Sequence, residues 1–228
     1  MKKTWIGTFC AACLGLALAY SLTFVSIPAS GQNTGSVKAS VTVPEGQVEN
    51  TVVRIEGVPG SNPRLKGVKQ SAEMGQKELQ FTPQMVAIPA GSTIDFPNHD
   101  KVFHNVFSLS RTKRFDLGLY KQGSSKSVTF NRPGVVDVYC NIHPQMVAKV
   151  LVVDTIHYGV ADKQGHVQID GVPAGTYPVV AWHPARGEAR GEVTIKPGQA
   201  SQVSLAITGE KQSERHLRKD GTPYGRYK

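Results

Sequence analysis

Residues 135–146 carry the clearest signal of fold and chemistry in this chain, and they read Val135-Val136-Asp137-Val138-Tyr139-Cys140-Asn141-Ile142-His143-Pro144-Gln145-Met146. Side chains alternate between the two faces of a β-strand, so Cys140 shares a face with two of the valines before it. The thiol is therefore expected to point toward a core. His143 and Met146 follow at intervals of three residues, close enough to turn back toward the same point.

A second histidine in a similar setting lies upstream, in Val102-Phe103-His104-Asn105-Val106. Strand alternation would put His104 on the same face as Val102 and Val106, again toward a core. Two imidazoles, one thiolate and a nearby thioether are the ligand set of a blue-copper electron-transfer site. The pattern predicts one copper ion, bound by His104, Cys140 and His143 with Met146 as the weak axial ligand.

Each of these residues has a simpler explanation when taken alone. A buried cysteine usually behaves as a small hydrophobic residue, and a methionine usually fills a core. A purely structural β-protein would leave the four-residue set as a coincidence. The short Cys-x-x-His-x-x-Met loop favours the metal site, because it restrains the three side chains together.

Composition favours an all-β globular protein. The 228 residues include 23 Gly and 14 Pro, which separate short runs of Val, Ile and Thr. The formal net charge is +9, which favours acidic partner surfaces or a membrane face. Nucleic acid is not expected as a partner, since the basic residues are scattered and not interleaved with aromatic ones.

Residues 1–30 have the features of an export signal: Lys2 and Lys3, then an apolar segment, then Ala29 and Ser30. We expect a cleaved signal peptide and a periplasmic protein. An uncleaved N-terminal membrane anchor is the alternative, because the apolar run is long enough to span a bilayer. Cleavage would lower the net charge to +7 and leave Cys140 as the only thiol, which excludes an internal disulfide.

The motifs in the middle of the chain resemble those of the cupredoxins, plastocyanin and amicyanin among them. The resemblance covers residues 73–154 and rests on the following: Phe96-Pro97-Asn98 with Asp100, His104-Asn105-Val106, and the stretch from Tyr139 to Met146. It implies a Greek-key β-sandwich in which Asn105 and Pro144 support the copper ligands without binding the metal. The Asn105 side chain would tie the two ligand loops together. It also implies redox partners such as a c-type cytochrome or a periplasmic dehydrogenase.

A second, smaller β-module is expected over residues 155–208. Its segment 165–179, with a Val-Pro-x-Gly turn followed by Tyr177, is similar to carboxypeptidase-regulatory-like (transthyretin-like) β-sandwiches. Five strands are few for a closed sandwich, so we expect a hairpin at 37–58 to complete this module, with the copper domain inserted between them. Residues 60–78 are expected to be loop, and the basic tail 209–228 to be extended or docked.

These features predict an electron carrier that performs no chemistry on a substrate. An oxidase would need His-x-His pairs, and a dinuclear copper site would need a second cysteine in the loop; the sequence has neither. A copper storage or delivery protein is the alternative. Residues 111–126 form a long charged segment after the His104 stretch, which we call the excursion. Its basic residues either lie in a solvated loop or form a docking surface for an acidic partner.

Overall fold

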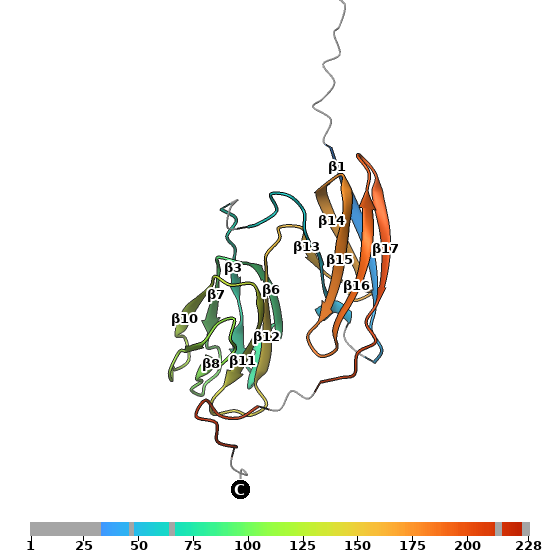
Figure 1. Cartoon of the computed structure of the whole chain (residues 1–228). Coiled ribbons are helices and arrows are strands. Elements are labelled where there is room, and N and C mark those ends of the chain that lie inside the picture. Colours follow the sequence, from blue (N-terminus) through green and yellow to red (C-terminus); the bar gives the residue numbers. More distant parts are fainter. Residues whose placement is uncertain (1–32, 46–47, 64–66, 213–215, 225–228) are drawn as a thin grey trace, which may run out of the picture. The chain divides into compact units, whose positions relative to one another are not determined.

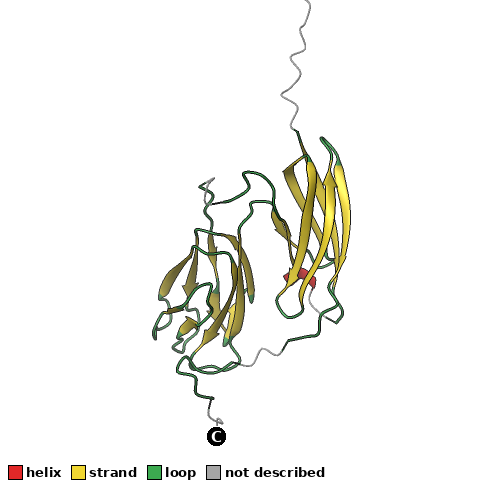
Figure 2. Cartoon of the chain, in the orientation of Figure 1, coloured by secondary structure: helices red, strands yellow, loops and turns green. Residues whose placement is uncertain are grey.

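The computed structural model describes residues 33–45, 48–63, 67–212 and 216–224. The predicted signal segment lies outside these residues. The described chain is all-β apart from one short 3-10 helix, η1 (Val48–Asn50), as Figure 2 shows. Within the described residues, no helix is long and apolar enough to cross a membrane.

The first β-sandwich, which we call the copper unit, consists of strands from the middle of the chain (Figure 1). One sheet has the order β10-β7-β3, the facing sheet has the order β6-β12-β11-β8-β9, and β4 pairs with β5. The strands are β3 (Ser71–Glu73), β4 (Gly75–Lys77), β5 (Gln80–Thr82), β6 (Met85–Pro89), β7 (Ser92–Pro97), β8 (Val106–Ser108), β9 (Phe115–Asp116), β10 (Ser125–Phe130), β11 (Gly134–Cys140) and β12 (Val147–Val153).

Strand β11 delivers the cysteine into the core of this unit. It pairs antiparallel with β12, with Val138 opposite Ala148. Val136, Val138 and Cys140 are all fully buried, and they share one hydrophobic core with Phe96. The predicted alternation along this strand is therefore confirmed, and it determines where the sulfur points.

The prediction that residues 60–78 are loop is wrong in its second half. Strand β3 pairs in parallel with β7, placing Ala72 opposite Ile94, and β4 pairs with β5. These strands are three residues long and mostly polar, so they have no hydrophobic periodicity to reveal them. Their formation depends on the ladders offered by neighbouring strands.

The remaining strands form a second unit around a separate core. Its sheets have the orders β14-β1-β17 and β13-β2-β15-β16. The strands are β1 (Thr34–Thr42), β2 (Val52–Ile55), β13 (Tyr158–Val160), β14 (His166–Pro173), β15 (Gly175–His183), β16 (Gly187–Ile195) and β17 (Ala200–Ala206).

The expected hairpin at 37–58 is wrong, because β1 and β2 belong to different sheets. Strand β1 pairs with β14 and, in parallel, with β17, which lies about 160 residues further along the chain (Figure 1). Strand β2 pairs with β13 and β15. This pairing supports our proposal that both strands complete the second module and that the copper domain is inserted between them.

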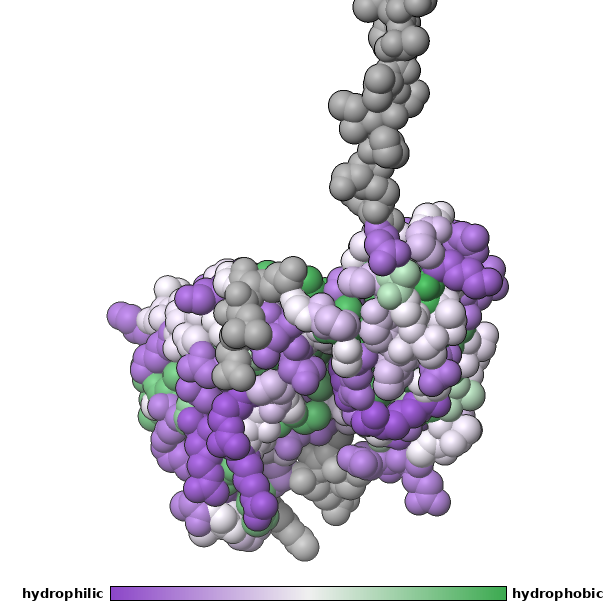
Figure 3. Space-filling view, turned by 45° about the horizontal axis from the view of Figure 1, so that its top comes forward, coloured by the Kyte–Doolittle hydropathy of each residue, from purple (hydrophilic) through white to green (hydrophobic). Residues whose placement is uncertain are grey.

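The face of the molecule seen in Figure 3 is mainly hydrophilic, with separate small hydrophobic patches. The large exposed hydrophobic side chains among the described residues are Leu79, Val102, Phe103, Leu109, Leu119, Val160 and Leu217. Val102 and Phe103 directly precede the candidate ligand His104 in the chain.

Candidate metal centre

The loop after β11 is closed by its own main chain. The Cys140 amide donates to the Met146 carbonyl at 3.2 Å, and the Met146 amide donates to the His143 carbonyl at 3.1 Å. Met146 is fully buried in the same core as Cys140, and His143 is half-buried. The three residues are thus held on one short, tightly bonded loop.

His104 reaches the same place by a route that the sequence did not predict. Strand β8 begins only at Val106, and Val102 is 44% exposed, so the predicted inward alternation from Val102 is wrong. His104 instead forms an isolated bridge with Tyr120: its amide donates to the Tyr120 carbonyl, and the Tyr120 amide donates back at 3.0 Å. The excursion 111–126 therefore supplies the strand partner that holds His104, which is completely buried.

Three candidate ligand atoms converge at this end of the sandwich. His104 Nδ1 and His143 Nδ1 are 3.1 Å apart, and the Cys140 sulfur lies 3.8 Å from the first and 3.5 Å from the second. A point equidistant from all three lies about 2.0 Å from each, close to ordinary metal–imidazole and metal–thiolate bond lengths. The donor set and its spacing fit one copper ion.

The electrostatics of the site favour the forms that bind metal. Burial, followed by the nearby His104 ring, lowers the pKa of His143 and so favours the neutral imidazole. His104 Nε2 lies 2.8 Å from a carboxylate oxygen of Asp100, which leaves Nδ1 facing the sulfur. Burial opposes ionisation of Asp100, but hydrogen bonds from the Leu79 amide, His104 and the Glu78 amide outweigh it and lower the pKa.

Asn105 links the two ligand loops, although not through its side chain as expected. Its carbonyl accepts a hydrogen bond from the Asn141 amide at 2.9 Å. Its side-chain amide donates to Asp116 at 2.6 Å. Pro144 follows His143 in the loop and is half-buried. The tie between the loops is therefore a main-chain bond, and the Asn105 side chain joins the ligand region to β9.

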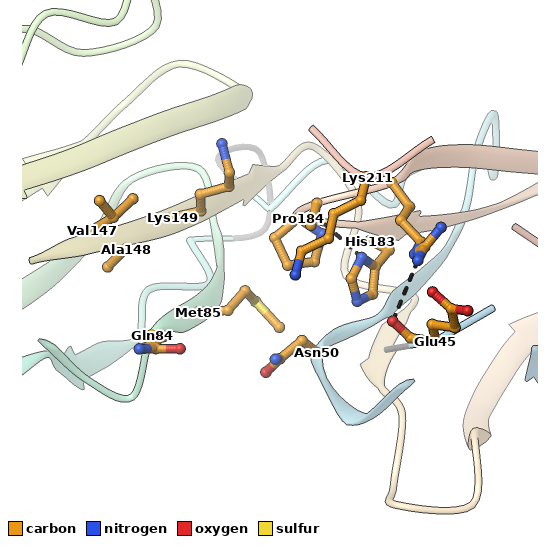
Figure 4. A pocket seen from close by; sticks show the side chains of 12 residues that line it. Glu45, Asn50, Gln84, Met85, Val147, Ala148, Lys149, His183, Pro184 and Lys211 are labelled. Atoms are coloured by element: carbon orange, nitrogen blue, oxygen red, sulfur yellow. Dashed lines mark hydrogen bonds between the residues drawn. The ribbon is translucent and has the colours of Figure 1, made fainter. Parts of the chain in front are cut away.

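The other histidines lie apart from this group. His99 is exposed. His183 is buried and lines a pocket shown in Figure 4, where Arg186 donates to the Glu45 carbonyl. None of the three convergent ligand residues lines that pocket. His216 is different, because its ring stacks on Tyr139, the residue before Cys140.

Sequence reasoning missed two supports of the site. Asp100 was noted only as part of a motif, although its spacing of four residues from His104 is a usable signal. Tyr120 gave no local signal, because its role depends on the folding of the excursion against His104.

These features are those of a mononuclear copper protein built on a β-sandwich. The family model for copper-binding proteins of the plastocyanin/azurin family matches residues 68–153. Amicyanin-alpha of Methylorubrum extorquens is 33% identical over 85 residues, covering 36% of this chain and 71% of that protein. The chain therefore belongs to the plastocyanin/azurin family of copper-binding proteins, and its cofactor is copper.

Solved structures with similarity to this chain include other cupredoxins. Amicyanin from Paracoccus versutus is 21% identical, with a TM-score of 0.34, and the match covers 44% of this chain and 97% of that one. The purple cupredoxin of Nitrosopumilus maritimus is 26% identical, with a TM-score of 0.33, over 36% and 99% of the two chains. A copper nitrite reductase from Thermus scotoductus is 22% identical, with a TM-score of 0.36; the match covers 38% of this chain but only 23% of that enzyme.

Proposed function

We propose that this protein is a mononuclear blue-copper electron carrier with His104, Cys140 and His143 as its strong ligands and Met146 as its weak axial ligand. The observation that carries the proposal is the convergence of one thiol and two ring nitrogens within 4.8 Å of one another. A copper ion bound there supplies reversible one-electron chemistry, and we assign no catalytic residue.

The protein's contribution is to hold the ligands still during electron transfer. Cys140 and His104 are fully buried and restrained by main-chain pairing, and the loop bonds of Met146 restrain His143. A rigid ligand set changes little between the two copper oxidation states, and hydrogen bonds around it tune the potential. This burial also argues against copper storage or delivery, which favours exposed and exchangeable ligands.

Electrons are proposed to enter and leave at His143, the half-buried member of the set. The side chains of Val102, Phe103 and Leu119 are 44%, 55% and 61% exposed. Asn98 ties their two segments together by donating to the carbonyls of Val102 and Tyr120. An apolar surface of this kind suits brief docking of a redox protein.

The proposed partners are a c-type cytochrome or a dehydrogenase of the periplasm, reached by export through the N-terminal segment. The second β-module is proposed to be a transthyretin-like scaffold without a reaction of its own. Its closed core and its two sheets are consistent with that role.

Copper loading tests the proposal. We expect one Cu(II) per chain and an intense visible thiolate-to-copper absorption band. Cys140→Ser, His104→Ala and His143→Ala should abolish the band, while His99→Ala should leave it intact because His99 is exposed and outside the group. A band that survives Cys140→Ser would refute the assignment.

Repeated oxidation and reduction in the presence of a Cu(I) chelator separates carriage from delivery. An electron carrier should keep its copper through many cycles. A delivery protein should release copper to the chelator on the first reduction, and that result would contradict the proposal.

A further inference from the structure

The C-terminal segment 216–224, which we call the strap, contacts the copper unit beside the cysteine ligand. In Figure 1 the red segment near the C-terminus lies next to the lower ends of β8 and β11. The Tyr224 hydroxyl donates to the Cys140 carbonyl at 2.6 Å. The Lys219 amide donates to the Asn141 side chain at 2.9 Å. These bonds join residues about 80 positions apart in the sequence.

An ion pair holds the middle of the strap. The Lys219 ammonium lies 2.6 Å from Asp116, whose other oxygen accepts the Asn105 side chain. Burial opposes ionisation of Asp116, but Lys219, Asn105 and the Gly118 amide outweigh it and lower the pKa. The strap therefore completes the polar network that extends from the ligand region.

Aromatic contacts hold the start of the strap. The His216 ring stacks on Tyr139, with centroids 4.1 Å apart and planes 16° apart. It also lies 6.4 Å from Phe107 and 5.2 Å from Tyr224. Stacked and edge-on rings at these separations are favourable beyond the area they bury.

The strap also has internal structure. The Gly221 amide donates to the Arg218 carbonyl, the Arg218 amide donates to the Thr222 carbonyl, and the Arg218 guanidinium lies 5.3 Å from the Tyr224 ring. These internal contacts fix the shape of the strap where it lies against the copper unit.

The strap site is the surface made by Phe107, Asp116, Tyr139, Asn141 and the Cys140 carbonyl. We propose that the strap site is a docking surface whose occupant is the chain's own residues 216–224, and that docking closes the Cys140 side of the metal centre. The ligand loop is then restrained on its inner side by its own main-chain bonds and on its outer side by the strap. His143 is left as the edge through which the site exchanges electrons.

This inference deepens the proposed function, and its copper-dependent part rests on it. The thiol of the metal-free protein reports on the strap independently. Cys140 is fully buried, so a thiol reagent reaches it only through local opening of the loop. The full chain carrying Cys10→Ser and Cys13→Ser leaves Cys140 as the only thiol to be followed.

We expect truncation after Gln212 to speed the reaction of Cys140 at least tenfold, with no change in the urea midpoint of global unfolding. Tyr224→Phe, which removes one hydrogen bond, should speed it about fivefold. Lys219→Met, which removes a partly exposed ion pair, should speed it about threefold. A synthetic peptide of residues 209–228 should slow the truncated protein again.

Lys211→Met is the matched control, since it removes the same charge from an exposed tail residue outside the strap. It should leave the rate unchanged. An effect equal to that of Lys219→Met, or a truncated protein that reacts within twofold of the parent, would overturn the inference.

The second measurement is the rate at which the loaded protein transfers copper to a chelator. This rate should be highest in the truncated protein, then fall through Tyr224→Phe and Lys219→Met, with Lys211→Met equal to the parent. If the protein fails to form the blue site, the proposed function fails while the thiol rates still decide the strap. If copper binds but the thiol-reaction and copper-transfer rates of the strap variants equal those of the parent protein, only the inference about the strap fails.

Discussion

Replacing Tyr120 with Phe removes one hydroxyl from the segment that pairs with His104. That hydroxyl donates to Gln76 Oε1 at 2.7 Å, and Gln76 Nε2 donates to the Met74 carbonyl at 3.1 Å. Gln76 is completely buried and Tyr120 is 5% exposed. The same Tyr120 bonds His104 through its main chain, so this buried pair supports the ligand from behind.

The expected cost follows from what the substitution leaves behind. In Tyr120→Phe the Gln76 oxygen stays buried without its donor and without water, which costs about 1–3 kcal/mol of unfolding free energy. The main-chain bonds between residues 104 and 120 are unchanged by the substitution. We therefore expect a loss of stability with little change in the copper absorption band.

The assay is urea unfolding of the metal-free protein at neutral pH. The free energies of unfolding of variant and parent are compared where their m-values are equal. Tyr158→Phe is the matched control, because its hydroxyl also donates to a glutamine oxygen, that of Gln70, at 3.0 Å. Gln70 is exposed, so water replaces the lost donor. We expect this control to cost less than about 0.5 kcal/mol.

A double variant provides the decisive comparison. If the cost arises from an orphaned polar atom, Tyr120→Phe combined with Gln76→Leu should cost less than the sum of the two single changes, by about 1 kcal/mol or more. Additive costs, or equal losses for Tyr120→Phe and Tyr158→Phe, would refute the reasoning.

Two further predictions concern the second module, away from the metal. Gly165→Ala should lower the melting temperature sharply, because Gly165 has φ of +83° and a Cβ there would lie 2.2 Å from the Val41 carbonyl oxygen. Gly57→Ala is the control, since Gly57 has φ of +71° but nothing within 4 Å of such a Cβ, and it should lower the melting temperature much less. Glu188→Gln should cost about 1 kcal/mol at pH 7, since Glu188 pairs with Arg54 at 3.0 Å. Burial favours the neutral form of Glu188, but its arginine partners outweigh burial and hold the pKa below its ordinary value of 4.5. The stabilisation by Glu188 is therefore present above pH 4.5 and should vanish as the pH falls through the folded pKa. A stability difference between the parent and Glu188→Gln that persists in acid would contradict the ion-pair explanation.

Much of the copper unit could be predicted from local pattern. Alternation along 135–140 indicated the buried face of β11, and burial of Val136, Val138 and Cys140 confirms it. Copper as the cofactor is confirmed by the family match. These features depend on periodicity and on neighbours within a few residues, which sequence displays directly.

Pairing between distant segments could not be predicted in this way. Strands β3 and β4 are too short and polar to show a period, and β1 and β2 show apolar runs without indicating that they belong to different sheets. A run of apolar residues predicts a strand. Its partner depends on which edge the rest of the fold leaves open.

The sequence by itself determined the donor types and the short loop that carries three of them. Only the tertiary structure decided how His104 reaches that loop, through a bridge to Tyr120 instead of a strand from Val102. It also decided that the last described residues bond to the Cys140 carbonyl. The physical reason is that the three loop donors are brought together by their spacing along the chain. His104 and the supports of the site depend on hydrogen bonds and ring contacts between segments that meet only after folding.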